Sequence, residues 1–330
     1  METDAFSLGK MSLQGHFGLA PMAGVTDLAF RTLCAEGGAC YAVTEMVSAK
    51  ALTFGDKKSA RLCRVSGDIP TAVQIFGSDP DVMAEGARLA LAHSDAPVID
   101  INMGCPMPKI TGNGEGSALL RDPALAARIV RAVADAVDVP VTVKFRIGWD
   151  GSSINATEVA KELEQAGVAA LCIHGRTRAQ GYSGRADREV MAQVVRSVSV
   201  PVMVNGDVFA PEDGKALLDA TGAKFAMIAR GSLGAPWIFS QCEACRRGDP
   251  VPPAPPPEAR LATLVRQVEL ACADKGEYVA IREARKTAAW YLKGFRGAAD
   301  CRRTCNELTS LSGLRRWAEE ALDSIRTAEE

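Results

Sequence analysis

The chain has 330 residues, of which 47% are hydrophobic and 24% are charged, as is usual for a soluble globular protein. Its formal net charge of −2 excludes a strongly basic surface over the whole molecule, so any nucleic-acid contact must be local. Residues 1–4 begin acidic and lead into no long apolar run, so we expect neither a signal peptide nor a membrane span, and a cytoplasmic location.

Eight short apolar stretches alternate with helix-like stretches along the first 230 residues. We expect strands at 17–22, 41–46, 71–77, 98–102, 141–147, 170–174, 201–205 and 224–229. Helices are expected at 27–36, 80–93, 123–137, 157–166, 188–198 and 211–221. Several of these begin with Asp or Pro, and Gly167 and Gly222 fall just past helix ends, where a left-handed cap is favoured.

This alternation predicts an α/β fold, a (β/α)8 TIM barrel. The expected strands are nearly continuous in Val, Ile, Leu and Ala, as strands buried on both faces should be. A doubly wound sheet is the alternative, but no Gly-x-Gly-x-x-Gly turn follows the first strand.

Polar or flexible residues stand at nearly every expected strand end. In a TIM barrel these ends meet at one face, where ligands bind. A barrel built only for stability needs no such ring, so the ring indicates a site. Its members are Pro21, Met22, Ala23, Glu45, Met46, Gln74, Asn102 to Cys105, Lys144, Arg146, His174, Arg176, Arg178, Asn205, Gly206, Asp207, Ala229, Arg230 and Gly231.

Cys105 lies between Gly104 and Pro106, directly after the expected strand 98–102. A free cysteine is most often a small buried hydrophobe. At the tip of a barrel strand, however, a thiol is well placed to meet a ligand. Residues 205–207 and 229–231 carry the glycines and the arginine of a phosphate-binding end, as loops seven and eight of barrels often do.

The ten cysteines include two close pairs, Cys242/Cys245 and Cys301/Cys305. Four such thiols could hold zinc or an iron–sulfur cluster. Both pairs lie in helix-like sequence without the turn residues of a zinc knuckle, so we interpret them as core packing and expect no metal site.

A proline tract at 250–257 is followed by sequence that is helical in character to the end. We therefore expect a barrel over 1–245, a linker over 246–257 and a smaller all-α domain over 258–330. Residues 275–316 hold ten basic and four acidic side chains, so this segment carries a charge of +6 and the remainder of the chain about −8. Arg282, Arg285 and Lys286 near Trp290 suggest a nucleic-acid surface, although a solvated charged face is the simpler interpretation.

Taken together, these motifs resemble the tRNA-dihydrouridine synthases, with the bacterial B-type branch as the nearest match over about residues 17–317. The resemblance is carried by Ala20-Pro-Met-Ala-Gly24, Thr44-Glu-Met46, Val73-Gln-Ile75, Asp100-Ile-Asn-Met-Gly-Cys-Pro106, Gly116-Ser-Ala-Leu119, His174-Gly-Arg-Thr-Arg178, Asn205-Gly-Asp207, Arg282-x-x-Arg285-Lys286 and Trp290-Tyr-Leu292.

The resemblance implies an FMN-containing barrel and a helical tRNA-binding domain, with NADPH as the reductant of the uridine C5–C6 bond. Cys105 would be the catalytic acid, and Asn102, Arg176 and Arg178 would face the substrate nucleotide. Arg282, Arg285 and Lys286 would contact tRNA. FMN would be lined by Pro21, Met22, Ala23, Gln74, Lys144, His174, Asn205, Gly206, Asp207, Ala229 and Arg230.

Two departures from the family pattern stand out: Ala229 precedes Arg230 where Gly is usual, and the loop at 107–115 differs. Two other functions fit parts of the sequence. One is a different FMN barrel oxidoreductase acting on a small molecule, for which the basic tail would have no purpose. The other is an RNA-binding protein without enzymatic activity, which would not bind flavin.

Overall fold

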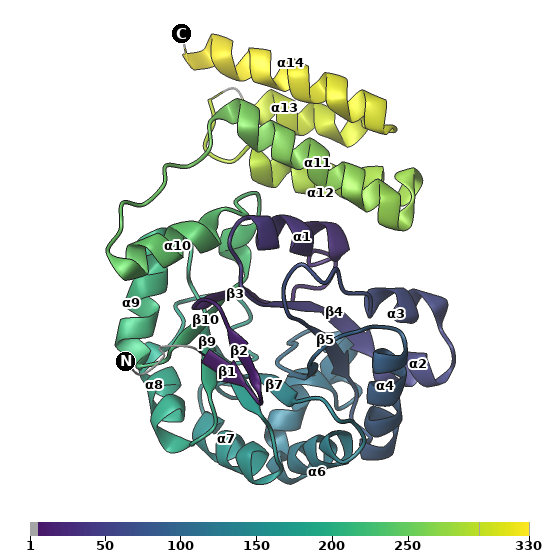
Figure 1. Ribbon diagram of the computed structural model, residues 1–330, viewed down its shortest axis with the longest axis vertical. Coiled ribbons are helices and arrows are strands. Elements are labelled where there is room, and N and C mark those ends of the chain that lie inside the picture. Colours follow the sequence, from purple (N-terminus) through teal and green to yellow (C-terminus); the bar gives the residue numbers. More distant parts are fainter. Residues whose placement is uncertain (1–5, 297, 330) are drawn as a thin grey trace.

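Eight parallel strands close into a barrel in the computed structural model, which describes residues 6–296 and 298–329 (Figure 1). The hydrogen-bonded order β10-β3-β4-β5-β6-β7-β8-β9 returns to its start. The strands are β3 (Phe17–Leu19), β4 (Ala42–Ser48), β5 (Thr71–Phe76), β6 (Ile99–Met103), β7 (Val141–Arg146), β8 (Ala170–His174), β9 (Val202–Asn205) and β10 (Phe225–Ile228).

The predicted TIM barrel and its eight strands are confirmed, with ends that shift by up to three residues. The first predicted strand, 17–22, stops at Leu19. The N–H of Ala20 still donates to the Ile228 carbonyl at 2.9 Å, but Pro21 has no N–H with which to continue the ladder.

Helices surround the barrel and include all six that the sequence predicts. They are α1 (Leu28–Glu36), α2 (Ala49–Thr53), α3 (Lys57–Leu62), α4 (Pro80–Ala92), α5 (Pro108–Thr111), η1 (Gly116–Arg121), α6 (Pro123–Ala134), α7 (Ala156–Gln165), α8 (Arg188–Ser197), α9 (Pro211–Thr221), η2 (Arg230–Ser232) and α10 (Ile238–Arg247). Side chains of Asp27, Asp79, Asp122 and Asp187 accept backbone N–H groups at four N-termini. Gly222 ends α9 at φ +71, as predicted.

Side chains alternate along the barrel strands, so that five of them, β4, β5, β8, β9 and β10, contribute to two hydrophobic cores. In β8, Leu171 and Ile173 belong to the core under the helices, whereas Ala170 and Cys172 face the barrel interior. A hairpin of β1 (Phe6–Leu8) and β2 (Met11–Leu13), which the sequence did not reveal, packs Phe6, Leu8 and Leu13 into that interior. In Figure 1 the hairpin lies across the barrel, so it closes one end.

The C-terminal part forms its own helical layer beside the barrel, drawn in green and yellow in Figure 1. It holds α11 (Pro257–Lys275), α12 (Glu277–Tyr291), α13 (Ala298–Thr304), η3 (Cys305–Glu307) and α14 (Leu311–Glu329). The helical spacing of Ile281, Ala284, Ala288 and Tyr291 is confirmed, since all four are buried in one core. The stretch without helix or strand before it is 248–256, because α10 runs to Arg247 and α11 begins at Pro257.

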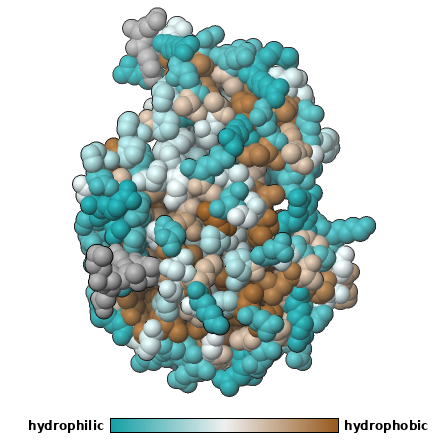
Figure 2. Space-filling view, in the orientation of Figure 1, coloured by the Kyte–Doolittle hydropathy of each residue, from teal (hydrophilic) through white to brown (hydrophobic). Residues whose placement is uncertain are grey.

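The two cysteine pairs lie in separate cores. Cys242 is buried under the barrel helices, whereas Cys301 and Cys305 are buried among the C-terminal helices. Within 6–296 and 298–329, no three His, Cys, Asp or Glu side chains gather as a metal ion would require. In the same ranges no helix is long and apolar enough to cross a membrane. Figure 2 shows hydrophilic side chains over most of the face seen in Figure 1, with hydrophobic groups between them.

Ion pairs join the C-terminal helices to the barrel. The ammonium of Lys275, at the end of α11, lies 2.5 Å from a carboxylate oxygen of Asp27 and also contacts Glu283. Asp27 in turn accepts the N–H of Phe30 and so caps α1. Arg64–Asp274 and Arg266–Glu36 add two more pairs across the same boundary.

Replacing Lys275 by Ala should lower the free energy of unfolding by about 2 kcal/mol, because two carboxylates then lose their partner in a largely buried contact. Urea denaturation followed by circular dichroism measures this. Lys215→Ala is the matched control, since the Lys215–Asp219 pair is exposed on α9 and should contribute less than about 0.5 kcal/mol. Equal losses in the two variants would show that the Lys275 contact does not stabilise the interface.

Candidate active site

A cavity of about 520 Å³ opens at the carboxyl ends of the barrel strands, a size that suits a cofactor or a substrate. The family resemblance assigns a catalytic, cofactor-binding or RNA-binding role to eighteen residues, and fourteen of them line this cavity. These are Pro21, Met22, Ala23, Gln74, Asn102, Cys105, Lys144, His174, Asn205, Gly206, Asp207, Ala229, Arg230 and Lys286. The strand ends therefore meet at one site, as the barrel geometry requires.

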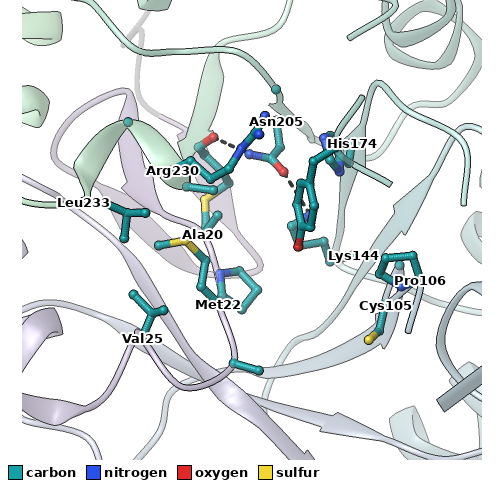
Figure 3. A pocket seen from close by; sticks show the side chains of 18 of the residues that line it. Ala20, Met22, Val25, Cys105, Pro106, Lys144, His174, Asn205, Arg230 and Leu233 are labelled. Atoms are coloured by element: carbon teal, nitrogen blue, oxygen red, sulfur yellow. Dashed lines mark hydrogen bonds between the residues drawn. The ribbon is translucent and has the colours of Figure 1, made fainter. Parts of the chain in front are cut away.

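Cys105 stands on one side of this cavity, across from Leu233 and Arg230 (Figure 3). Its backbone is held from both directions: its N–H donates to Asn102 Oδ1 at 2.9 Å, and its carbonyl accepts the Ser117 hydroxyl at 2.9 Å. Arg146 Nε donates to the carbonyl of Gly104 at 2.7 Å and holds the same loop. The thiol is thus fixed at the rim by contacts that leave it facing the cavity.

Burial raises the pKa of the Cys105 thiol above its ordinary value, although the Met107 N–H and the charge of Arg146 act in the opposite direction. The side chain is only partly buried, so a ligand can still reach it. A thiol with a raised pKa is protonated at neutral pH. Cys105 can therefore donate a proton, whereas a thiolate nucleophile would need the opposite shift.

The opposite side of the cavity is built around the Asp207 carboxylate. Asp207 accepts the Ala186 N–H at 2.7 Å and contacts Arg176 Nη2 at 2.8 Å and Arg230 Nη2 at 3.5 Å. Partial burial acts to raise the pKa of Asp207. The Ala186 N–H and the Arg176 guanidinium act in the opposite direction and together outweigh burial, so the pKa lies below its ordinary value. Within the described ranges Asp207 is the one non-glycine residue with a positive φ, +50, a strained conformation that these contacts maintain.

Asp207 therefore cannot contact a phosphate through its carboxylate, because the two would repel. Its contribution to an anion site is to hold Arg230 in place. Close packing requires glycine at two positions here: a Cβ on Gly206 would lie 2.6 Å from Ala186 Cβ, and one on Gly231 would lie 2.0 Å from the Val208 carbonyl oxygen. The loops after β9 and β10 can therefore approach each other closely at this end of the cavity.

Cations dominate the cavity lining, with Lys144, Arg146, Arg230 and Lys286 against the single acid Asp207. Lys144 Nζ donates to Asn205 Oδ1 at 3.0 Å, and burial lowers its pKa. Burial, and after it the charges of Lys144, Arg146, Arg176 and Arg230, place the pKa of His174 well below its ordinary value. His174 is therefore neutral at pH 7, and the cavity as a whole favours an anionic ligand.

Four predicted residues lie outside the cavity lining. Arg176 corrects the sequence-based expectation that it faces a nucleotide: it is 2% exposed, and its guanidinium donates to Asp207 and to the carbonyls of Ser183 and Gly184. Arg178 lies over the Trp149 ring, 4.4 Å from its centre. In the tail, Arg285 donates twice to the Leu308 carbonyl, and Arg282 lies exposed over Tyr278.

Arg146, which the sequence places in the ring of strand ends, also lines the cavity, two residues after Lys144 and on the same face of β7. The structure adds three aromatic residues that sequence reasoning did not assign to the site. Tyr182 and Phe209 flank Arg230, with ring centres 5.0 and 5.3 Å from its guanidinium carbon. Trp290 reaches the cavity from α12 beside Lys286, whose Nζ lies 5.2 Å from the indole ring.

The family model for dihydrouridine synthase matches residues 18–327 of this chain. The chain belongs to the dihydrouridine synthase family. It is 44% identical over 303 residues to a protein of Pseudomonas aeruginosa named tRNA-dihydrouridine synthase B, with 91% of each chain covered. It is 41% identical over 328 residues to the protein of that name from Pseudomonas putida, covering 98% of this chain and 97% of the relative. The relative from Vibrio vulnificus is 41% identical over 302 residues, with 91% and 94% covered. The resemblance drawn from the sequence motifs is thereby confirmed.

The raised pKa of Cys105 can be measured without any ligand. Iodoacetamide reacts with the thiolate, so the rate of Cys105 alkylation should rise with pH around a midpoint above about 8.5, the ordinary value for a free thiol. Mass spectrometry of the Cys105 peptide gives this rate. In denaturant the same peptide should titrate at the ordinary value, and a lower midpoint in the folded protein would contradict a protonated thiol.

Proposed function

We propose that this chain is a tRNA-dihydrouridine synthase that reduces the C5–C6 bond of uridine in tRNA, with FMN as its cofactor and NADPH as its reductant. The observation that carries the proposal is a protonated thiol fixed across a cavity from a cationic phosphate-type end. Membership of the dihydrouridine synthase family limits the possible reactions to uridine reduction. The residues that line the cavity supply the proton donor and the cationic groups that this reaction needs.

The cavity fits FMN by the chemistry of its lining. The backbone beside Gly206 and Gly231, together with Arg230, would hold the phosphate. Lys144 and His174 would contact the ring and the ribityl chain from the interior, and Gln74 and Asn205 would orient them. Pro21, Met22, Ala23 and Ala229 would provide apolar contact. When bound and reduced, FMN supplies the hydride that C6 of uracil accepts.

Reduction at C6 leaves C5 in need of a proton. Cys105 Sγ would donate it from the side opposite the flavin, and its raised pKa keeps that proton in place at neutral pH. Asn102, which lines the cavity, would hydrogen-bond the uracil edge. The base must leave its stack in the folded RNA to reach this rim.

The division of labour that we propose is a catalytic barrel over 1–245, a linker over 246–257 and an RNA-binding domain over 258–330. Lys286 and Trp290 support it, since α12 brings both to the rim of the barrel cavity. There a basic side chain can contact a phosphate and an indole can stack on a base. Arg282 offers a further cation on the same helix.

Cys105→Ala should retain FMN and still oxidise NADPH, but form dihydrouridine about 10² to 10⁴ times more slowly, because the proton donor to C5 is lost. Flavin absorbance, NADPH consumption and dihydrouridine content of a tRNA transcript are the three measurements. Cys245→Ala, which removes a half-buried thiol on α10 away from the cavity, is the control and should keep full activity.

Loss of flavin from Cys105→Ala would make this cysteine structural, and unchanged dihydrouridine formation would rule out its thiol as the acid. A purified protein that remains colourless after addition of FMN would contradict the cofactor assignment. Mapping dihydrouridine in total RNA from a strain without this protein would identify the uridines: loss at a set of tRNA positions is expected.

Lys286→Ala should weaken tRNA binding about tenfold at low salt and reduce the slope of log Kd against log salt concentration by about one, because one phosphate contact is lost. Filter binding at several salt concentrations measures both. Lys161→Ala on the outer face of the barrel is the matched control and should change neither. An unchanged salt slope in Lys286→Ala would place the RNA elsewhere.

A further inference from the structure

A chain of hydrogen bonds crosses the barrel interior and ends at the backbone of Cys105. Thr142 Oγ1 and Gln74 Nε2 both donate to the carboxylate of Asp100, each at 2.6 Å. Asn102 Nδ2 donates to Gln74 Oε1 at 2.8 Å. Asn102 Oδ1 then accepts the N–H groups of Gly104 at 3.1 Å and Cys105 at 2.9 Å. Three strands, β5, β6 and β7, and the loop carrying the thiol are thereby connected.

The direction of the hydrogen bonds from Cys105 to Asp100 is determined from the backbone end. Backbone N–H groups can only donate, so Asn102 presents Oδ1 to Gly104 and Cys105 and its Nδ2 to Gln74. Gln74 then accepts through Oε1, which leaves its Nε2 to donate to Asp100 Oδ2. Asp100 is therefore the acceptor at the far end of the series.

This orientation decides what the cavity presents to a ligand. Gln74 and Asn102 line the cavity, whereas Asp100 does not. The amide nitrogen of Gln74 carries a second N–H that these hydrogen bonds do not use, whereas Asn102 Nδ2 also donates weakly to Met46 Sδ at 3.8 Å. Together with the Lys144 ammonium, these groups make the inner wall rich in hydrogen-bond donors, which suits the carbonyl oxygens of a flavin or a uracil.

Stability alone does not account for a carboxylate at position 100. Asp100 is 3% exposed, and its pKa is raised by burial against the opposing effects of Thr142, Gln74 and Lys144. Apart from Gln74 and Thr142, which bond to it, Asp100 shares the barrel interior with apolar side chains such as Ala72, Ala170 and Met203. A buried carboxylate is a costly choice in such a layer unless its acceptor character is used.

We propose that Asp100 is a positioning residue: as the buried acceptor at the far end of these hydrogen bonds, it holds Gln74 and Asn102 in their orientations and thereby holds the Cys105 thiol in position. The expected effect of Asp100 on dihydrouridine formation rests on the proposed function. Its effect on the position of the Cys105 loop does not. Asp100 acts through the chain and touches neither cofactor nor substrate.

The test compares Asp100→Ala with Asp100→Asn. Asp100→Ala should slow single-turnover formation of dihydrouridine about 100-fold at saturating tRNA, with tRNA affinity unchanged, because the thiol is misplaced. Asp100→Asn should stay within about threefold, since its amide oxygen still accepts from Gln74 while Thr142 accepts its N–H. Thr221→Val, which removes a buried hydrogen bond at the end of α9, is the control for general destabilisation and should not slow the reaction.

A double variant tests whether Asp100 acts through Asn102. Asp100→Ala combined with Asn102→Ala should be no slower than Asn102→Ala alone, since the connection is already broken. If the fold-decrease in rate of the double variant equals the product of the fold-decreases of the two single variants, Asp100 does not act through Asn102 and the proposal is overturned. Equal rates in Asp100→Ala and the unchanged protein, with only a lower thermal midpoint, would also overturn it.

A readout without RNA separates this inference from the proposed function. The alkylation rate of Cys105 should change about fivefold or more in Asp100→Ala and stay within about twofold in Asp100→Asn and Thr221→Val, because only the first variant releases the loop. If the alkylation rate changes in this way but the unchanged protein forms no dihydrouridine, the proposed function is rejected and the positioning role of Asp100 is retained. An unchanged alkylation rate would reject the positioning role. If Asp100→Ala does not fold, Asp100→Val fills the space and is tested in the same way.

Discussion

Closure of eight parallel strands into a barrel makes all of them end at the same rim, and the site depends on this constraint. Alternation along each strand then sends every second side chain inward. Near the rim these inward positions are polar, as at Gln74, Lys144 and Asn205. Polar groups in so enclosed a place are stable only when they bond to each other. The interior of the barrel is therefore both its core and the inner wall of its cavity.

The electrostatics of the rim follow from the same enclosure. Several cations gather where solvent is largely excluded, so each raises the energy of the next. The carboxylate of Asp207 reduces the repulsion between these cations because it pairs with Arg176 and Arg230. These contacts hold the Asp207 backbone at a positive φ. Burial, and after it the remaining positive charge, lowers the pKa of His174 and keeps it neutral, and burial keeps the proton on Cys105. The protonation states that the reaction needs are present before any ligand binds.

Local patterns predict the barrel well because each strand and helix has its own periodicity and end signals. Once the strands were identified, the residues at their carboxyl ends could be named, and many of these residues line the cavity. Arg176 was misplaced because alternation ends with β8 at His174, after which the loop folds back and buries the guanidinium. The position of Trp290 at the cavity depends on how α12 docks, which no local pattern encodes. Strands as short as β1 and β2 are also too brief to show a period.

The wall that α12 adds to the cavity has a consequence for how the protein is assembled. Synthesis proceeds from the N-terminus, and domains fold as they emerge. The rim with Cys105 is therefore complete while Lys286 and Trp290 are still unmade, and the cavity is open on that side. The last side of the cavity then depends on one close contact: Gly234, in the loop after β10, packs directly against the backbone of Trp290, so any side chain at position 234 would push α12 away from it.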